Sequence, residues 1–329
     1  HTIGRRQRQM CIRDRLLQPV LGDVISNFEH ETNKKLIIIP DDELAYVPFE
    51  PFLCEKTSKQ EPYTNLAYLI KYFNISYHYS ATLFHYTSKR QATRPLLAES
   101  FIGFAPVYTK HLYKSAPDLI PIETSNNEKL QETLQLYNKK YQELIYSKHE
   151  VHNISLLFQK EGISAQTLFH GTASKTNFLK YLGNHKYVHV AAHGLLNKTE
   201  PNLSGIIFHP EKGETFKENA VFHISDAYHL DLKTDLMVLS SCESGIGNLV
   251  KGEGMMTINR GFLYAGVSNI VFTLFKVYDR PSFELTQIFY QDIVAGKNYA
   301  QALRKAKLHL IEQKKSTPLS WAGFVLIGI

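Results

Sequence analysis

The chain has 329 residues, 43% of them hydrophobic and 21% charged, with a formal net charge of +6. This composition is typical of a globular protein with a sizeable core, and no apolar run approaches the roughly 18 residues that a membrane span needs. Residues 1–15 hold five Arg and one Asp, which leaves about +2 for the rest of the chain. That charge argues against a nucleic-acid-binding protein, which needs a concentrated basic face.

Residues 1–15, HTIGRRQRQMCIRDR, begin with His and have neither a helical nor a strand period. We expect them to be a non-native leader, such as translated adapter or vector sequence, with the folded domain over residues 16–329. The three cysteines, Cys11, Cys54 and Cys242, lie far apart and form no CxxC pair. They predict neither a disulfide framework nor a zinc site, and they favour a reducing, cytoplasmic setting. We expect no cofactor.

Seven short runs rich in β-branched and aromatic residues predict buried strands. In chain order these are Leu36–Ile39, Ile75–Tyr79, Phe101–Ala105, Tyr187–Ala192, Asp235–Ser241, Asn269–Phe275 and Phe324–Ile327. Apolar residues at helical spacing predict helices over Glu150–Lys160, Glu253–Tyr264, Pro281–Val294 and Tyr299–Gln313, with Gly266 and Gly296 as helix stops. Strands that alternate with helices predict an α/β fold around a largely parallel sheet.

The segment from Tyr108 to His149 is polar and rich in Lys, Glu and Asn. It contains no strand pattern, and we expect a surface loop followed by a charged helix over about Asn127–Tyr146. This polar connection, residues 108–149, divides the chain into an N-terminal α/β portion, about residues 20–107, and a second portion, residues 150–329.

Two of the predicted strands end on residues that can do chemistry. The run KYVHVAAHG delivers His193 with Gly194 directly after it, and DLMVLSSCESGIG delivers Cys242. Because the carboxyl ends of parallel strands form the ligand-binding crevice of an open sheet, neighbouring strands would bring this imidazole and this thiol together. Their separation of 49 positions is enough for a crossover that returns to the same edge.

A thiol with a pKa near 8.5 is a weak nucleophile at neutral pH unless a base or a cation lies beside it, and an imidazole can serve as either. Acyl transfer also needs hydrogen-bond donors for the developing oxyanion, and the backbone N–H groups of Gly194 and Cys242 are the candidates. Taken singly, a Cys that ends an apolar strand is usually a small core residue. A lone His before Gly is usually a strand-end side chain bonded to backbone.

Two other sites are weighed and set aside. His185, His189 and His193 are spaced by four, but on a strand four residues extend about 13 Å, too far for one metal ion. Gly245, Gly247 and the glycines that follow lack the Gly-Lys-Ser/Thr order of a phosphate-binding loop. A Gly-rich loop beside the thiol is the interpretation that we keep.

From about Leu36 to Ile329 the chain resembles the CHAT domain, a caspase-like peptidase family that is also related to separase. Six blocks carry the resemblance in order: LIIIPDDELAYVPFEPFL, YHYSATLF, VHVAAHG, LMVLSSCESGIG, GEGMMTINRGFLYAGVSNIVFTLFKVYD and SWAGFVLIG. The resemblance implies a three-layer caspase–haemoglobinase-like sandwich, preceded by a degenerate α/β portion. It also implies cysteine endopeptidase activity on protein substrates, with His193 as general base and acid, Cys242 as nucleophile, and Gly194 with Cys242 as the oxyanion hole.

The resemblance further implies that tetratricopeptide (TPR) repeats or similar recognition modules commonly precede this domain. The stretch that usually reads Leu-Trp-Pro-Val-Asp-Asp in the family is Leu274–Asp279 here, with Phe275 for the Trp and Tyr278 for the first acid. The retained Asp279 resembles the separase acid that faces a basic P1 side chain, so it is the candidate S1 residue. A helix-capping Asp before Pro281 is the alternative, and Lys276 on the same rim weakens a basic-P1 preference.

Two hypotheses therefore follow from the sequence. The first is a cysteine endopeptidase with a His193–Cys242 dyad, no metal or cofactor, and neither a membrane nor nucleic acid as partner. The second is a catalytically silent interaction or sensor module that keeps the caspase-like fold, which the altered stretch Phe275–Tyr278 favours.

Overall fold

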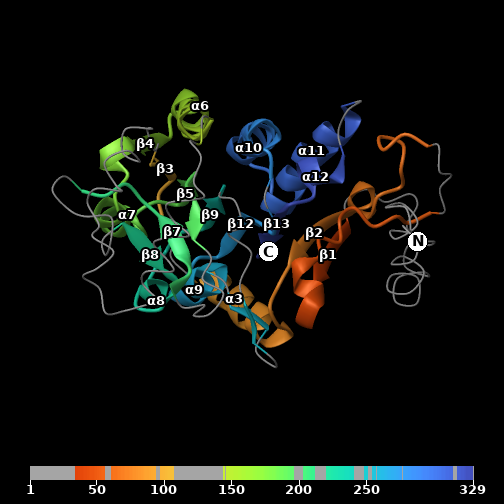
Figure 1. Ribbon diagram of the computed structural model, residues 1–329, viewed down its shortest axis with the longest axis horizontal. Helices are drawn as coiled ribbons and strands as arrows, with labels where there is room; N and C mark the ends of the chain where they lie inside the picture. Colours follow the sequence, from red (N-terminus) through yellow and green to blue (C-terminus); the bar gives the residue numbers. More distant parts are fainter. Residues whose placement is uncertain are drawn as a thin grey trace, which may run out of the picture.

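The computed structural model describes residues 34–55, 61–93, 97–106, 144, 146–195, 203–211, 220–240, 248–250, 254–256, 258–275, 277–313 and 317–328. Within these residues, a central sheet of eight strands in the order β1-β2-β13-β12-β9-β5-β3-β4 carries helices on both faces (Figure 1). The fold is thus the three-layer α/β sandwich that the sequence predicts. The strands are β1 (Lys34–Ile38), β2 (Phe73–Tyr77), β3 (Ser100–Ala105), β4 (Ser164–Phe169), β5 (Tyr187–Val190), β9 (Leu236–Leu239), β12 (Asn269–Thr273) and β13 (Phe324–Ile327).

The central sheet is mostly parallel and consists of two blocks that run in opposite directions. The strands β4, β3, β5, β9 and β12 are parallel to one another, and β13 pairs antiparallel with β12. The strands β1 and β2 then continue parallel to β13. All seven strands predicted from the sequence are present, and β4 is an additional strand at the edge of the sheet.

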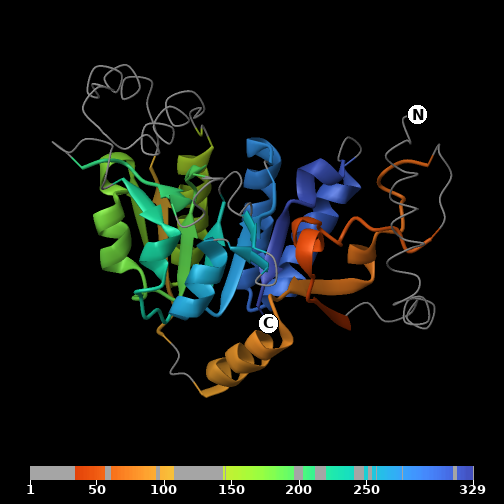
Figure 2. The ribbon, with the colours of Figure 1, turned by 60° about the horizontal axis from the view of Figure 1, so that its bottom comes forward.

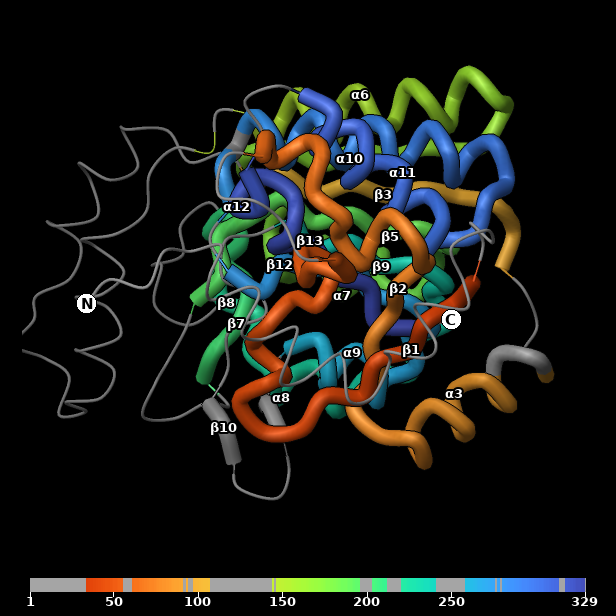
Figure 3. The backbone as a smooth tube through the Cα atoms, turned by 90° about the vertical axis from the view of Figure 1, so that its right-hand side faces the viewer, coloured from red at the N-terminus to blue at the C-terminus, as the bar shows by residue number. Residues whose placement is uncertain are grey.

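Helices cover each face of the sheet as a separate layer. On one face lie α6 (Ser147–Lys160), α10 (Asp279–Val294), α11 (Tyr299–Glu312) and α12 (Pro318–Trp321). On the other lie α7 (Lys175–Tyr181), α8 (Ile224–Ala227) and α9 (Ile258–Ala265), while α3 (Ala81–Thr93) projects below the sheet (Figures 2 and 3). Gly266 and Gly296 follow α9 and α10 with φ angles of 116° and 80°, which confirms both predicted helix stops.

Alternating residues of β3 show how the two layers are held. Phe101 stacks on Phe158 of α6, with ring centroids 4.8 Å apart, on one face. Phe104 meets Phe178 of α7 at 5.3 Å on the opposite face. Because all of these rings are fully buried, β3 is locked between two apolar layers, as a central parallel strand must be.

The central sheet unites strands from both portions that the polar connection separates. The strand β3, from residues 20–107, lies between β4 and β5, which both come from residues 150–329. The strands β1 and β2 sit beyond β13 at the other end of the sheet. The predicted leader 1–15 lies outside the described residues, as does most of the predicted charged helix, and α6 already begins at Ser147.

Two smaller sheets and one helix boundary differ from the sequence-based expectation. The strands β6 (Gly194–Leu195), β7 (Gly205–Ile207) and β8 (Val221–His223) form an antiparallel sheet, and β10 (Asn248–Val250) pairs with β11 (Gly254–Met256). The helix predicted over Glu253–Tyr264 is therefore wrong at its start, because Gly254–Met256 is a strand and α9 begins at Ile258. In the part of the chain that the structure describes, no helix is long and apolar enough to cross a membrane.

Candidate active site

The strands β5 and β9 are parallel neighbours at the centre of the sheet, as predicted. Their register runs from Tyr187 opposite Leu236 to Val190 opposite Leu239. The ladder continues one step further, where the Ser240 N–H donates to the Val190 carbonyl at 2.9 Å. All eight strand residues are buried, so the carboxyl ends of both strands are fixed at the same height on the sheet edge.

His193 lies three residues after the end of β5 and is only 7% exposed. Its carbonyl oxygen accepts a hydrogen bond from the Ile207 N–H at 2.9 Å, which ties the residue to β7. The backbone around His193 is thus held by β5 on one side and by the small antiparallel sheet on the other. A general base needs such a fixed position more than it needs exposure, because its geometry decides whether it can reach the reacting proton.

Gly194 begins β6 and is paired with Ile206 in β7. Since the hydrogen bond runs from the Ile207 N–H to the His193 carbonyl, Gly194 and Ile206 form the non-hydrogen-bonded kind of antiparallel pair. The Gly194 N–H therefore points away from β7. An N–H that is directed off the edge of a sheet in this way can donate to an oxyanion without breaking a ladder bond.

Cys242 lies outside the described residues, which end at Ser240 on this strand. The register of β5 and β9 relates the position of Cys242 in the sequence to that of His193. Cys242 follows Leu239 by three residues, and His193 follows Val190, the register partner of Leu239, by the same three. The structure therefore describes one half of the predicted dyad and the strand that leads to the other half.

Asp279 is the first residue of α10, and its side chain lies outside the described residues. The helix-capping alternative is wrong in one respect, because the helix begins two residues before Pro281 and its N-cap is Tyr278. Asp279 thus occupies the first turn, where a carboxylate still interacts favourably with the helix dipole. The strand that precedes Asp279 in the chain, β12, is the parallel neighbour of β9. The segment after β12 therefore leaves the sheet at the same edge as the segment that holds His193.

A buried polar cluster of His189, Glu150 and Tyr290 joins β5 to α6 and α10. It was not predicted from the sequence. The His189 Nε2 atom lies 3.1 Å from the Glu150 Oε1 atom, and His189 Nδ1 lies 3.2 Å from the Tyr290 hydroxyl. The first contact is within ion-pair distance, but it is not aligned as a hydrogen bond. Burial, with the Glu150 charge as a second cause, holds the pKa of Tyr290 well above its usual range.

The histidines that the sequence spaces by four have separate surroundings, and only His189 belongs to this cluster. His185 lies before β5 and contacts the Tyr181 carbonyl through Nδ1 at 3.3 Å, whereas His189 faces α6 and α10 from mid-strand. The described residues include no group of three or more metal-ligating side chains. A signal for the cluster existed, because Glu150 stands in the turn before Val151 and Ile154 on the buried face of α6.

The sequence was compared with families and individual proteins. A family model described as "CHAT domain" matches residues 9–329. Tetratricopeptide repeat protein 28 of Mus musculus is 32% identical over 106 residues, which is 32% of this chain and 4% of that protein. Its Homo sapiens counterpart is 31% identical over the same length. The chain therefore spans a small fraction of the curated relatives that it matches.

The structure was compared with solved structures. The Arg-specific cysteine proteinase gingipain R has a TM-score of 0.51 and 9% identity, over 94% of this chain and 67% of gingipain R. The Saccharomyces cerevisiae separase–securin complex has a TM-score of 0.47 and 14% identity, over 82% of this chain and 15% of that chain. At such identities the likeness to gingipain R concerns the fold.

Proposed function

Because the chain belongs to the CHAT domain family and has a caspase-like peptidase fold, we propose that it is a cysteine endopeptidase with His193 and Cys242 as its dyad. The observation that carries the proposal is the register of β5 and β9. It aligns Val190 with Leu239, so that equal offsets of three residues lead to His193 and to Cys242. Ser240, the last described residue of this segment, stands two residues before Cys242, and two residues extend at most about 7 Å.

The chemistry follows from these positions. His193 takes the proton of the Cys242 thiol, and the sulfur attacks the carbonyl carbon of a peptide bond in the substrate. The carbonyl oxygen becomes an oxyanion that accepts from the N–H groups of Gly194 and Cys242. Collapse of this intermediate breaks the C–N bond, and His193 returns its proton to the leaving amine.

The remaining acyl-enzyme is a thioester on Cys242. His193 then takes a proton from water, the hydroxide attacks the thioester carbonyl, and the carboxylic acid product leaves as the thiolate is restored. The direction of the Gly194 N–H, away from β7, supports its part in both steps. The buried contact between His189 and Glu150 supports a rigid β5 behind His193.

The substrate preference and the partner are extensions of the proposal. Asp279, at the start of α10, is the S1 candidate for a basic P1 side chain. An Asp279→Asn variant is expected to lose about tenfold in rate toward a P1 Arg substrate relative to a P1 Leu substrate, whereas Glu284→Gln on the same helix is the matched control. A TPR module as regulatory partner is supported by the names of the mouse and human relatives.

The test is mass-spectrometric labelling of the folded protein with a broad peptidyl electrophile. We expect Cys242 to be labelled and buried Cys54 to remain unlabelled. His193→Ala should abolish labelling of Cys242, while His185→Ala, a half-buried histidine near the other end of β5, should preserve it. Labelling of Cys242 that is absent in the wild type and in both variants would favour the second candidate, a silent interaction module.

A further inference from the structure

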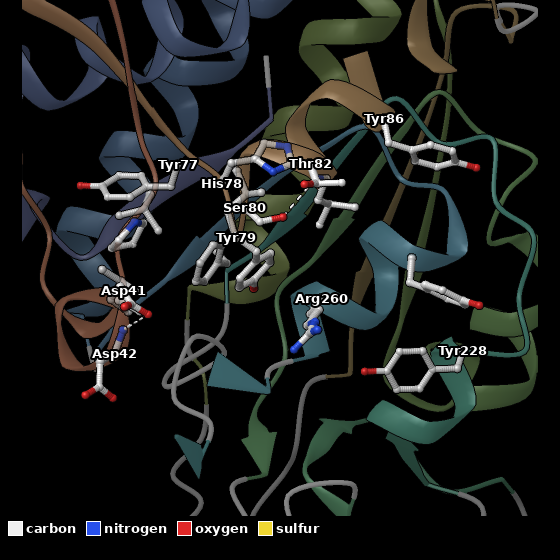
Figure 4. A pocket seen from close by; sticks show the side chains of 18 residues that line it. Asp41, Asp42, Tyr77, His78, Tyr79, Ser80, Thr82, Tyr86, Tyr228 and Arg260 are labelled. Atoms are coloured by element: carbon white, nitrogen blue, oxygen red, sulfur yellow. Dashed lines mark hydrogen bonds between the residues drawn. The ribbon is translucent and has the colours of Figure 1, made fainter. Parts of the chain in front are cut away.

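A large cavity lies beside the joint of β13 and β2. Its volume is about 1040 Å³, at the upper end of the range for small-molecule sites. Its floor is the apolar face of the sheet, formed by Phe272, Leu274, Val325 and Ile327. The segments after β1 and β2, with α3, α9 and the C-terminal end of α8, supply the remaining walls (Figure 4).

Tyrosines dominate the walls. Tyr79 and Tyr228 are half-buried, whereas Tyr86 on α3 and Tyr264 on α9 are 62% and 70% exposed. Tyrosines with one wet and one apolar side are typical of surfaces that bind peptides, because they offer large contact area at a small entropic cost. The two exposed rings extend the apolar surface beyond the cavity, so an occupant can continue across the protein surface.

The charged groups of the lining have an acidic balance. Asp41 and Asp42, both exposed, stand where the 3-10 helix η2 (Asp42–Tyr46) begins, and Arg260 of α9 is the cation of the lining. Figure 4 shows the acidic pair on one side of the cavity and Tyr86 and Tyr228 on the other. Two carboxylates against one guanidinium disfavour an anionic occupant and favour a cationic one.

His78 is a buried polar residue of the lining and is only 2% exposed. Its Nε2 atom lies 3.2 Å from the Thr87 hydroxyl oxygen, which also lies 2.9 Å from the Leu83 carbonyl oxygen. With the hydroxyl proton directed at the Leu83 carbonyl, Nε2–H of His78 is the donor to Thr87, and Nδ1 is a buried nitrogen without a partner among the described residues. Burial lowers the pKa of His78 to about 4, so the ring stays neutral at pH 7.

From these observations we infer that the cavity binds a peptide segment that carries basic and apolar side chains. Ammonium and guanidinium groups only donate hydrogen bonds, and the exposed carboxylates of Asp41 and Asp42 keep acceptor oxygens beyond the one that takes the Asp42 N–H. The tyrosine rings and the apolar floor extend beyond this acidic pair (Figure 4), which suits an extended chain rather than a single small cation. Lys and Arg side chains also bind favourably over tyrosine rings.

The inference does not depend on the proposed peptidase activity, because the acidic pair and His78 follow β1 and β2, which run antiparallel to the strand block that leads to His193. It concerns binding of a partner protein through one of its segments. A free polyamine shares the cationic chemistry but lacks the apolar side chains that the tyrosine walls would contact. The test below separates the two.

The experiment is fluorescence anisotropy of the full chain with two fluorescein-labelled hexapeptide amides, LKFLRF and LEFLEF. We expect saturable binding of the basic peptide and binding at least about tenfold weaker for the acidic one. Asp41→Asn with Asp42→Asn should weaken the basic peptide about tenfold, and Asn at position 41 still accepts from the Asp42 N–H, which protects the turn. Glu43→Gln, an exposed acid on the same 3-10 helix outside the lining, should leave the affinity unchanged.

The tyrosine wall is tested in the same assay. Tyr86→Ala should weaken the basic peptide by about threefold to tenfold, whereas Tyr146→Ala, which removes a partly exposed ring outside the lining, should not. The inference would be overturned if LKFLRF did not bind saturably, if both peptides bound equally, or if Asp41→Asn with Asp42→Asn had no effect. Displacement of LKFLRF by an equal concentration of spermidine would also overturn it and identify a polyamine site.

Discussion

Two joints of the same sheet differ in the length of their strand ladders and in whether a cavity opens beside them. The joint between β5 and β9 has four register pairs, and the buried polar residue of β5, His189, is in contact with Glu150 and Tyr290. At the joint between β13 and β2, the register of the described residues consists of one pair, Ile327 opposite Tyr77. The other residues of both strands, 73–76 and 324–326, are described but form no further pair across this joint. Nearby, Nδ1 of His78 has no hydrogen-bond partner in the described part of the chain, and a cavity opens beside the joint.

The difference teaches where this fold is closed and where it is open. The first joint is packed on both faces, which suits residues that must be held for chemistry. The second joint is held by a buried ion pair, Lys307 Nζ to Glu50 Oε1 at 2.6 Å, which links the N-terminal portion to α11. The Tyr77 hydroxyl also donates to Glu50, at 2.5 Å, and Tyr77 lines the cavity. An open cavity therefore coexists with a fully buried polar anchor beside it.

The largest expected effect comes from breaking that anchor. Lys307→Met leaves Glu50 as an uncompensated buried charge, and we expect a loss of about 3–5 kcal/mol in the free energy of unfolding. Adding Glu50→Gln should recover much of this loss, because the neutral amide can still accept from Tyr77. Urea titration measures both.

Lys305→Met is the matched control for this prediction. Lys305 stands two residues away on α11, is 56% exposed, and pairs with Asp292. The expected change is below about 1 kcal/mol, as for surface ion pairs in general. Equal losses for Lys305→Met and Lys307→Met would mean that the buried pair is not the anchor of this joint.

A smaller effect is expected from disturbing the small sheet beside the first joint. A Cβ atom at Gly205 would lie 2.1 Å from the Phe222 carbonyl oxygen, so Gly205→Ala must displace β7. We expect the free energy of unfolding to fall by about 3 kcal/mol at most. The rate of electrophile labelling of Cys242 should decrease by about tenfold or more, because the Ile207 N–H of β7 holds the His193 carbonyl.

Gly171→Ala serves as the control, since its nearest neighbour would be an imidazole atom at 3.8 Å. Chemical denaturation and labelling are measured on the same samples. If Gly205→Ala lowered stability and left the labelling rate unchanged, the small sheet would have no part in positioning His193.

The smallest effect concerns pH and the open joint. Burial lowers the folded-state pKa of His78 to about 4, against about 6.5 in the unfolded chain. As the pH falls, the unfolded state therefore binds a proton at this histidine before the folded state does. The contribution of neutral His78 to the free energy of unfolding is complete above pH 6.5 and is lost between pH 6.5 and pH 4. His78→Gln should show a smaller fall in Tm over this window, by about 3 °C.

The control for this prediction is His85→Gln on α3, a histidine outside the cavity lining, which should follow the wild-type curve. Calorimetric scans at four pH values would give the comparison. Parallel curves for wild type and His78→Gln would show that His78 is not a buried neutral base at this joint.

The sequence predicts the central sheet well because its strands are buried on both faces and read as continuous apolar runs. Phe324–Ile327 is predicted to the residue, and β5 and β9 are predicted as neighbours. The edge strand β4 is missed, since SAQTLF alternates between exposed and half-buried positions and has no apolar run. The strands β6, β7 and β8 have two or three residues each, too few to show a period.

The helix start at Ile258 is missed for a different reason. The Met-Met pair before it fits a helical pattern, but pairing of β11 with β10 prevails, and glycine at position 254 has a low helix propensity. The cavity leaves no local signal, because its lining comes from distant segments between Pro40 and Ile327 that meet only in the fold. The dyad stays a prediction from the sequence, whereas the parallel pairing of β5 and β9 that it assumed is present in the structure.

The most direct measurement of the central claim is the rate of alkylation of Cys242 by iodoacetamide in the folded protein at pH 6.5, with buried Cys54 as internal reference. A dyad predicts that Cys242 reacts at least about tenfold faster than Cys54, and that His193→Ala removes this advantage while His185→Ala keeps it. A Cys242 that reacts no faster than Cys54, or equally fast with and without His193, would contradict the account.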